Sequence, residues 1–132
     1  MQCLDRVALR SHRDLRAWQK SDAVRRRVLD LVKVESARRD LAFRDQADRA
    51  SASACRNLAE GFYRYRHRDF ARFVTIARAS LGELLESADE ARIKGYVNDQ
   101  EHFELEAQIQ EAMRVTTGLL RYLRGTNPAP GT

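Results

Sequence analysis

The residues best suited to chemistry lie in one short segment, NLAEGFYRYRHRDF, which spans Asn57–Phe70. Aromatic rings and cations alternate in its second half. Guanidinium groups bind phosphate oxygens through paired hydrogen bonds, and tyrosine rings stack on unpaired bases. The segment therefore predicts binding to nucleic acid, mainly through phosphates. The residues expected to take part are Arg56, Tyr63, Arg64, Tyr65, Arg66, His67, Arg68 and Arg72.

A structural interpretation of this segment stays open, in which Tyr63 and Tyr65 close one end of a helical bundle and the arginines face water. A second basic set is expected at the opposite end of the bundle. For that set a solvated helix face is the better explanation, but Arg25 and Arg26 are kept as candidate nucleic-acid contacts. The set consists of Arg25, Arg26, Arg27, Arg38, Arg39 and Arg44.

The net charge of +5 is unevenly spread along the chain. Residues 1–72 hold 18 Lys and Arg against 10 Asp and Glu, whereas residues 73–132 hold 6 against 9. Arginine supplies 21 of the 24 cations. An excess of this kind predicts an anion-binding surface contributed by the first half of the chain. The alternative is that a codon bias favours arginine and that the charged helix faces are simply solvated.

The spacing of histidines and carboxylates argues against an enzyme. A di-iron site in a helical bundle needs two Glu-x-x-His motifs and two further glutamates. The nearest approximation is Asp99-x-x-His102, and His12 and His67 lie in other segments. The chain has no glycine-rich phosphate loop and no nucleophile elbow. We therefore expect no catalytic activity, no metal site and no cofactor.

The two cysteines, Cys3 and Cys55, are too few and too far apart in sequence to indicate a disulfide framework or a zinc site. Cys55 is expected to be a buried small side chain. No apolar run approaches the roughly 18 residues that a membrane span needs. Asp5 and Arg6 interrupt any apolar N-terminal segment, which argues against a secretory signal. We expect a cytoplasmic protein with no membrane partner.

The apolar spacing is helical, and no proline interrupts residues 11–125. Helices are expected near Asp14–Val34, Asp40–Glu60 and Arg68–Lys94, and from a cap at Asn98 to Gly125. Gly61, Gly95 and Gly125 are expected to end the second, third and fourth helices. Asn98 and Glu101 have the spacing of a capping box. Because the connections are short, consecutive helices should be antiparallel. The expected fold is an all-α, up-down-up-down four-helix bundle, a single domain over residues 14–125, with an N-terminal extension at 1–13 and a disordered tail at 126–132.

Two sequence blocks resemble the signature of a bacterial four-helix bundle family, the ribosomal S23 or 23S rRNA intervening-sequence proteins. QADRASASACRNLAEG resembles the family's Q-x-x-R-A-x-x-S-I-P-x-N-I-A-E-G, and FVTIARASLGEL resembles F-L-x-I-A-x-G-S-L-x-E-L. The resemblance extends over about residues 14–123. The chain departs from the motif at Ala54 and Cys55, where the family has Ile-Pro, and at Ala79, where it has glycine.

The polar and small residues of the matched motif are interpreted as architectural. Asn57 and Glu60 should bond a neighbouring helix or subunit, because buried polar groups need hydrogen-bond partners. Ser53 and Ser80 should place small hydroxyls where two helices approach closely. The full set is Gln46, Ser53, Asn57, Glu60, Gly61, Ser80 and Glu83.

The resemblance implies a homopentamer that binds nucleic acid and catalyses no reaction. It also relates the chain to the accessory variability determinant of diversity-generating retroelements, which binds a reverse transcriptase and its template RNA. Three hypotheses follow. The first is a non-enzymatic protein that binds RNA or an RNA–DNA hybrid, with RNA favoured over DNA. The second is an adaptor for a reverse transcriptase, and the third is a purely structural oligomer.

Overall fold

We describe residues 9–125 of the protein from a computed structural model, and all regular structure in that range is helical. Four helices are long, one helix spans five residues, and a short 3-10 turn precedes them. Each of these helices is too short or too polar to cross a lipid bilayer. The elements are η1 (His12–Asp14), α1 (Arg16–Leu31), α2 (Glu35–Arg39), α3 (Leu41–Phe62), α4 (His67–Ile93) and α5 (Asp99–Leu123).

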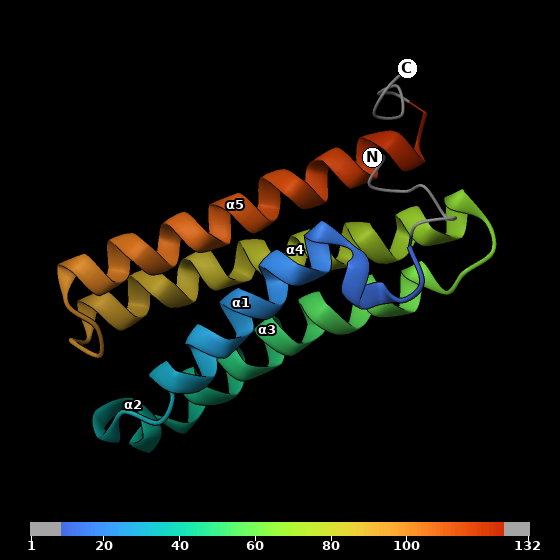
Figure 1. The fold of residues 1–132 in the computed structure, drawn as a ribbon. Helices are drawn as coiled ribbons and strands as arrows, with labels where there is room; N and C mark the ends of the chain where they lie inside the picture. The colour runs from blue at the N-terminus through green and yellow to red at the C-terminus, as the bar shows by residue number, and fades with distance from the viewer. Residues whose placement is uncertain (1–8, 126–132) are drawn as a thin grey trace.

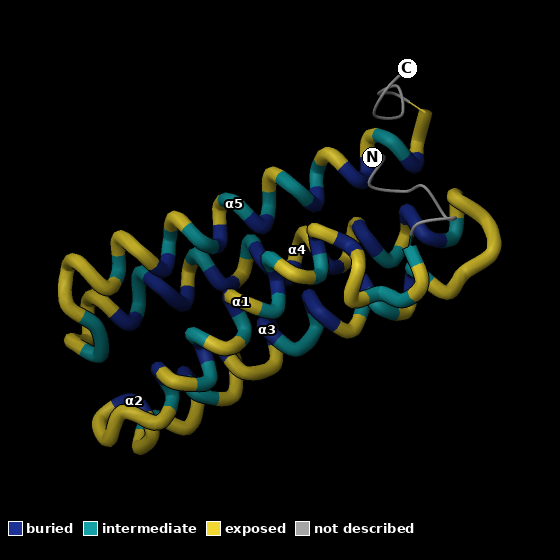
Figure 2. The backbone as a smooth tube through the Cα atoms, viewed as in Figure 1, coloured by how far each residue is buried: buried dark blue, intermediate teal, exposed yellow. Residues whose placement is uncertain are grey.

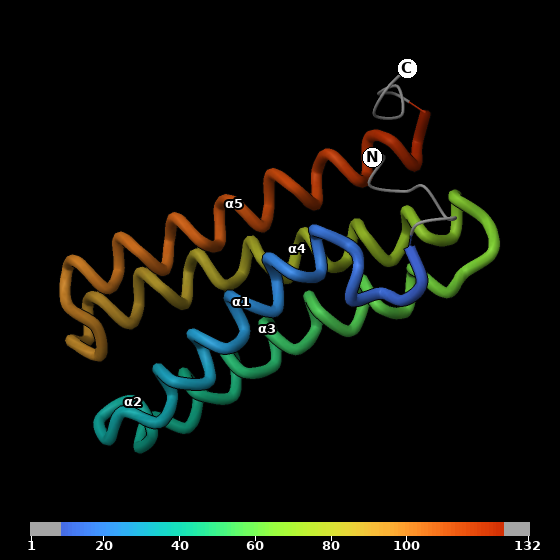
Figure 3. The backbone as a smooth tube through the Cα atoms, viewed as in Figure 1, coloured from blue at the N-terminus to red at the C-terminus, as the bar shows by residue number. Residues whose placement is uncertain are grey.

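The four long helices pack side by side (Figure 1). α3 contacts α1 and α4, and α5 contacts the same two helices, so each long helix has two neighbours. The start of α1, the α3–α4 connection and the end of α5 lie at one end, while α2 and the α4–α5 connection lie at the other (Figure 3). Aromatic rings connect the segments at the first of these ends. His12 of η1 packs on Tyr63 after α3, and His67 of α4 packs on Tyr122 of α5.

Small side chains let α3 approach α4 closely, as the sequence predicts. The buried residues on α3 include Ala47, Ala50, Ala54 and Leu58. Serine inside a helix is unfavourable unless its hydroxyl has a partner, and the Ser51 hydroxyl donates to the Asp48 carbonyl at 3.0 Å. Buried positions recur along the inward side of each long helix (Figure 2). The core is filled by apolar side chains from all four long helices.

The prediction that Gly61 ends a helix is wrong. α3 continues through Phe62, and Gly61 is buried inside its last turn. A Cβ at this position would lie 2.7 Å from Cδ1 of Phe70 and 3.0 Å from Cβ of Phe73. Gly61 is therefore needed for close packing between α3 and α4. Positive φ angles occur instead at Gly95 and Gly125, which follow α4 and α5 as expected.

Two short helical elements were not expected from the sequence. Ser11 caps the 3-10 turn η1, and α1 begins separately after Leu15 rather than at Asp14. The connection after α1 contains α2, whose Ala37 is buried. The capping box of Asn98 and Glu101 at the start of α5 is confirmed. The N-terminal residues 1–8, which include Cys3, and the predicted tail 126–132 lie outside the described residues.

Asp40 joins two connections at the end of the bundle that contains α2. Its carboxylate caps α3 by accepting from the Phe43 N–H, and it also accepts from Lys94 Nζ at 2.8 Å and from the Tyr96 hydroxyl at 2.7 Å. These bonds, that of Lys94 first, lower the pKa of Asp40 from 3.8 to about 2. The same contact with Asp40 raises the pKa of Lys94, and Glu90 adds to the effect.

Replacement of Gly61 by alanine should destabilise the fold. The added methyl group would overlap the buried ring of Phe70, and overpacking of this kind costs about 1–3 kcal/mol. Gly118→Ala is the matched control, because a Cβ there meets nothing within 4 Å. That control should stabilise helix α5 by about 0.5–1 kcal/mol. Urea denaturation measures both variants, and a Gly61→Ala protein as stable as the wild type would refute this account of the α3–α4 contact.

Asp40 should make stability depend on pH in the acidic range. Because its folded pKa is lowered from 3.8 to about 2, its stabilising effect is complete above the unfolded value and is lost as the pH falls through the folded one. Asp40→Asn should therefore lower the urea midpoint at neutral pH. The difference from the wild type should shrink as the pH falls from about 3.8 to about 2. Asp30→Asn, which removes an exposed carboxylate from the same end, should show little effect. A margin independent of pH contradicts the assignment.

Candidate nucleic-acid interface

Charge is segregated between the two ends of the bundle. We call the end formed by residues 9–20, 53–82 and 112–125 the basic end. It contains 13 Lys and Arg and 3 Asp and Glu, a net charge of +10. The remaining described residues, 21–52 and 83–111, contain 10 Lys and Arg and 15 Asp and Glu, a net charge of −5. Potentials of this kind attract polyanions to one end and repel them from the other.

This arrangement corrects the expectation that the first half of the sequence supplies the basic surface. The basic end combines the start of α1 and the C-terminal part of α3 with the first half of α4 and the last half of α5. Sequence reasoning missed the contribution of the last segment because its cations, Arg114, Arg121 and Arg124, are separated from the others by an acidic stretch. It also did not include Arg78 of α4 among the candidate contacts.

The two tyrosines of the α3–α4 connection have different environments. The Tyr63 hydroxyl accepts from the His12 backbone N–H at 3.3 Å and lies 3.2 Å from His12 Nδ1, so this side chain closes the end of the bundle. Partial burial, with Arg13 nearby, lowers the pKa of His12. Tyr65 is 94% exposed. Tyr63 is 62% exposed, but His12 and Phe62 pack against its ring, so Tyr65 is the more accessible of the two rings for a base.

The arginines around the connection are mostly not neutralised. Arg64 forms an ion pair with Glu60 at 2.8 Å and lies 4.8 Å from the centre of the Phe73 ring. Arg66, Arg68 and Arg72 are exposed and form no ion pair within residues 9–125. His67, the first residue of α4, packs its ring on Tyr122. The free guanidinium groups are suited to binding phosphate.

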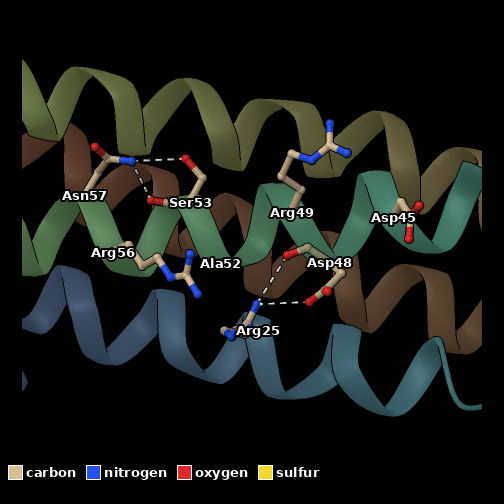
Figure 4. Close-up of a pocket in the computed structure, with 8 residues that line it drawn as sticks. All are labelled: Arg25, Asp45, Asp48, Arg49, Ala52, Ser53, Arg56 and Asn57. Atoms are coloured by element: carbon tan, nitrogen blue, oxygen red, sulfur yellow. Dashed lines mark hydrogen bonds and ion pairs between the residues drawn. The ribbon is translucent and has the colours of Figure 1, made fainter.

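A polar hollow of about 540 Å³ lies along α3 (Figure 4). Arg25 reaches it from α1 and donates to the Asp48 carbonyl at 3.3 Å, to Asp48 Oδ1 at 3.4 Å and to Ser51 Oγ at 3.1 Å. Arg49 and Arg56 also line it, as does Asp45, and the two carboxylates offset part of the positive charge. The hollow therefore brings Arg56 near Arg25, but Arg25 is held by the bundle itself.

Arginines of the second basic set are largely balanced by carboxylates. Arg26 pairs with Asp22 at 2.9 Å, Arg39 pairs with Glu35 at 2.7 Å, and Arg27 lies 3.9 Å from Glu104. Arg44 donates to the carbonyl of Arg38. These contacts are those of a solvated, charge-balanced helix surface. The structure does not bring Arg26 to the basic end.

The motif residues occupy two different environments. Ser53 and Ser80 share a 2.7 Å hydrogen bond between α3 and α4. Asn57 donates to the Ser53 carbonyl at 2.8 Å, within its own helix α3 rather than to the neighbouring helix that was expected. Glu60 pairs with Arg64 along its own chain segment rather than with another helix. Exposed motif side chains also occur further from the basic end. They are Gln46 on α3 and Glu83 on α4.

The Cys55 thiol and the His102 imidazole have surroundings that suit a structural role rather than a reactive one. Burial raises the pKa of Cys55 to about 11, so its thiol stays protonated at neutral pH. His102 bonds Asp89 at 2.8 Å, and Glu106 lies 3.9 Å away. Within the part of the chain that the structure describes, no three His, Cys, Asp or Glu side chains are grouped to hold a metal ion.

Comparison with known proteins identifies a family. The family model described as 23S rRNA-intervening sequence protein matches residues 13–118. Among curated proteins, no sequence matches the chain. The matched range includes all of α1 to α4 and most of α5, but it ends before the last two arginines of the basic end, Arg121 and Arg124.

Proposed function

Because the chain belongs to the 23S rRNA-intervening sequence protein family, we propose that it is a non-enzymatic protein that binds RNA, or an RNA–DNA hybrid, through the phosphates. The observation that carries this proposal is the net charge of +10 at the end of the bundle where Arg66, Arg68 and Arg72 lack carboxylate partners within the described residues. Phosphate contacts supply most of the affinity in such interfaces but little sequence specificity. Specificity would then come from the shape of the nucleic acid or from a partner.

The exposed ring of Tyr65 favours a ligand with unpaired bases. It stands between Arg64 and Arg66 in the α3–α4 connection, so a base stacked on it would place its phosphates beside guanidinium groups. Base stacking does not depend strongly on sequence, because every base has a π face. This arrangement suits single-stranded RNA, or a loop or bulge in a folded RNA.

The proposal includes assembly into a homopentamer of up-down-up-down bundles in the cytoplasm. The alternating positions of the connections in Figure 3 support the topology. The exposure of Gln46 and Glu83 supports self-association, because an architectural role for these motif residues requires partners that residues 9–125 of one chain do not provide. Light scattering of the purified protein measures the number of subunits.

RNA binding should be strong at low salt and should weaken steeply as salt is added. Each phosphate contact to a single strand contributes about 0.7 to the log–log slope of affinity against salt concentration, so several contacts give a slope of several units. The combined substitutions Arg64→Glu, Arg66→Glu and Arg68→Glu should remove most of the affinity. Filter binding of a labelled single-stranded RNA over a KCl series measures both effects.

The matched control makes the same change in net charge at the opposite end of the bundle, through Lys33→Glu, Arg38→Glu and Arg92→Glu. These three side chains are exposed and form no ion pair in residues 9–125. The control should retain most of the affinity of the wild type. Negligible binding by the wild type at low salt would support a purely structural oligomer, and equal losses in both variants would contradict a localised interface.

Tyr65→Ala should weaken binding to single-stranded RNA more than binding to duplex RNA. Loss of one stacked base costs about 1–3 kcal/mol, whereas a duplex offers no unpaired base to this ring. Phe103→Ala removes another aromatic ring, 68% exposed, from the α5 start at the opposite end and should have no effect. Fluorescence anisotropy with both RNAs measures the difference, and an equal loss for both would exclude stacking.

A further inference from the structure

The outer surface between α4 and α5 carries a row of arginines that extends away from the α3–α4 connection. Two hollows lie along it, of about 380 Å³ and about 410 Å³. The first is lined by Arg68, Arg72 and Arg124, and the second by Arg78, Arg114 and Arg121. We call these six residues the seam arginines.

Two seam arginines are held in place across the seam by hydroxyl groups. Arg78 on α4 donates from Nε to Thr117 Oγ1 on α5 at 2.7 Å. Arg124 on α5 donates from Nη2 to Thr75 Oγ1 on α4 at 3.2 Å. The Thr75 hydroxyl in turn donates to the carbonyl of Ala71 at 2.9 Å, which fixes its lone pairs towards the arginine. A neutral hydroxyl orients a guanidinium group without cancelling its charge.

Each held guanidinium keeps donors for a further ligand. Arg78 uses only Nε for Thr117, and Arg124 uses only Nη2 for Thr75. No ion pair joins Arg68, Arg72, Arg78, Arg114 or Arg124 to a carboxylate in the described residues. Oriented guanidinium groups lose less conformational freedom when they bind an anion, which increases affinity.

The surroundings of the seam are also poor in negative charge. Residues 67–82 of α4 and 112–125 at the end of α5 contain six arginines and one carboxylate, Asp69. The lining of the two hollows includes small residues, Ala71 in one and Gly118 in the other, so a ligand can approach the backbone of the helices. Since α-helices rise 1.5 Å per residue, the interval from Arg68 to Arg78 spans about 15 Å.

We propose that the α4–α5 seam is a phosphate-binding track, in which the seam arginines contact consecutive phosphates of a nucleic-acid strand that leaves the α3–α4 connection. The track rests on the proposed function, because it adds a second set of contacts to the same ligand. It assigns a binding role to Arg78, Arg114 and Arg124, which lie outside the α3–α4 connection.

The test is the salt dependence of RNA binding by the full chain carrying Arg114→Gln and Arg124→Gln. Loss of two phosphate contacts to a single strand should lower the log–log slope by about 1.4 units. The matched control, Arg38→Gln with Arg92→Gln, removes the same charge from exposed positions at the opposite end and should leave the slope unchanged. Fluorescence anisotropy of a fluorescein-labelled single-stranded RNA over a KCl series measures the slope.

A second double variant separates the orientation of the seam arginines from their charge. Thr75→Val with Thr117→Val keeps all six seam arginines but removes both hydroxyl acceptors. Affinity should fall several-fold while the slope stays near that of the wild type, because the charges remain but are no longer oriented. Circular dichroism checks that each variant stays folded. Wild-type affinity in this variant would contradict the orienting role of the hydroxyls.

The outcomes distinguish the track from the proposed function. If the Arg114→Gln, Arg124→Gln protein has the slope of the wild type while charge reversal at Arg64, Arg66 and Arg68 abolishes binding, the track is wrong and the function stands. If the wild type itself does not bind RNA at low salt, the proposed function fails and the track fails with it. A reduced slope in the seam variant alone supports the track.

Discussion

The close approach of α3 to α4 is the constraint on which the rest of the structure depends. It requires a face of α3 made of alanine and serine, and a glycine at position 61, where any side chain would meet the buried Phe70. Because the two helices pack to their very ends, the chain reverses within residues 63–66. That reversal leaves Tyr65 exposed beside Arg64 and Arg66. The candidate interface is thus a consequence of helix packing, since the same contact that completes the core also exposes the ring and the cations.

The segregation of charge follows from how the helices are arranged. Each of α4 and α5 is basic in one half and acidic in the other, and their packing places the two basic halves together. Repulsion between like charges at that end opposes folding, and burial of the apolar core offsets it. At the opposite end carboxylates approach the cations, as in the contacts of Asp40 with Lys94 and of Asp22 with Arg26. A polyanion binding the basic end would relieve the repulsion there, so ligand binding should also favour the folded state.

Much of the fold could be predicted from the sequence, because its signals are local. The capping box at Asn98 and the glycines at 95 and 125 depend on a few neighbouring residues and are confirmed. The role of Gly61 could not be predicted, because the side chain that excludes a Cβ there comes from another helix. In the candidate interface, too, local signals could be predicted from the sequence, whereas contacts between helices could not. The arginines beside Tyr65 are visible as a motif, whereas Arg114 and Arg124 join them only after folding, and their threonine partners lie across a seam between helices.

The central claim is that phosphates bind the basic end of the bundle, where Arg66, Arg68 and Arg72 form no ion pair within residues 9–125. The most direct measurement is an NMR titration of the arginine side-chain Nε–H signals with a short single-stranded RNA. The account predicts that the signals of Arg66, Arg68 and Arg72 shift at the lowest RNA ratios while those of Arg26 and Arg39, which are paired with carboxylates at the other end, stay in place. Shifts spread evenly over both ends, or confined to Arg26 and Arg39, would contradict it.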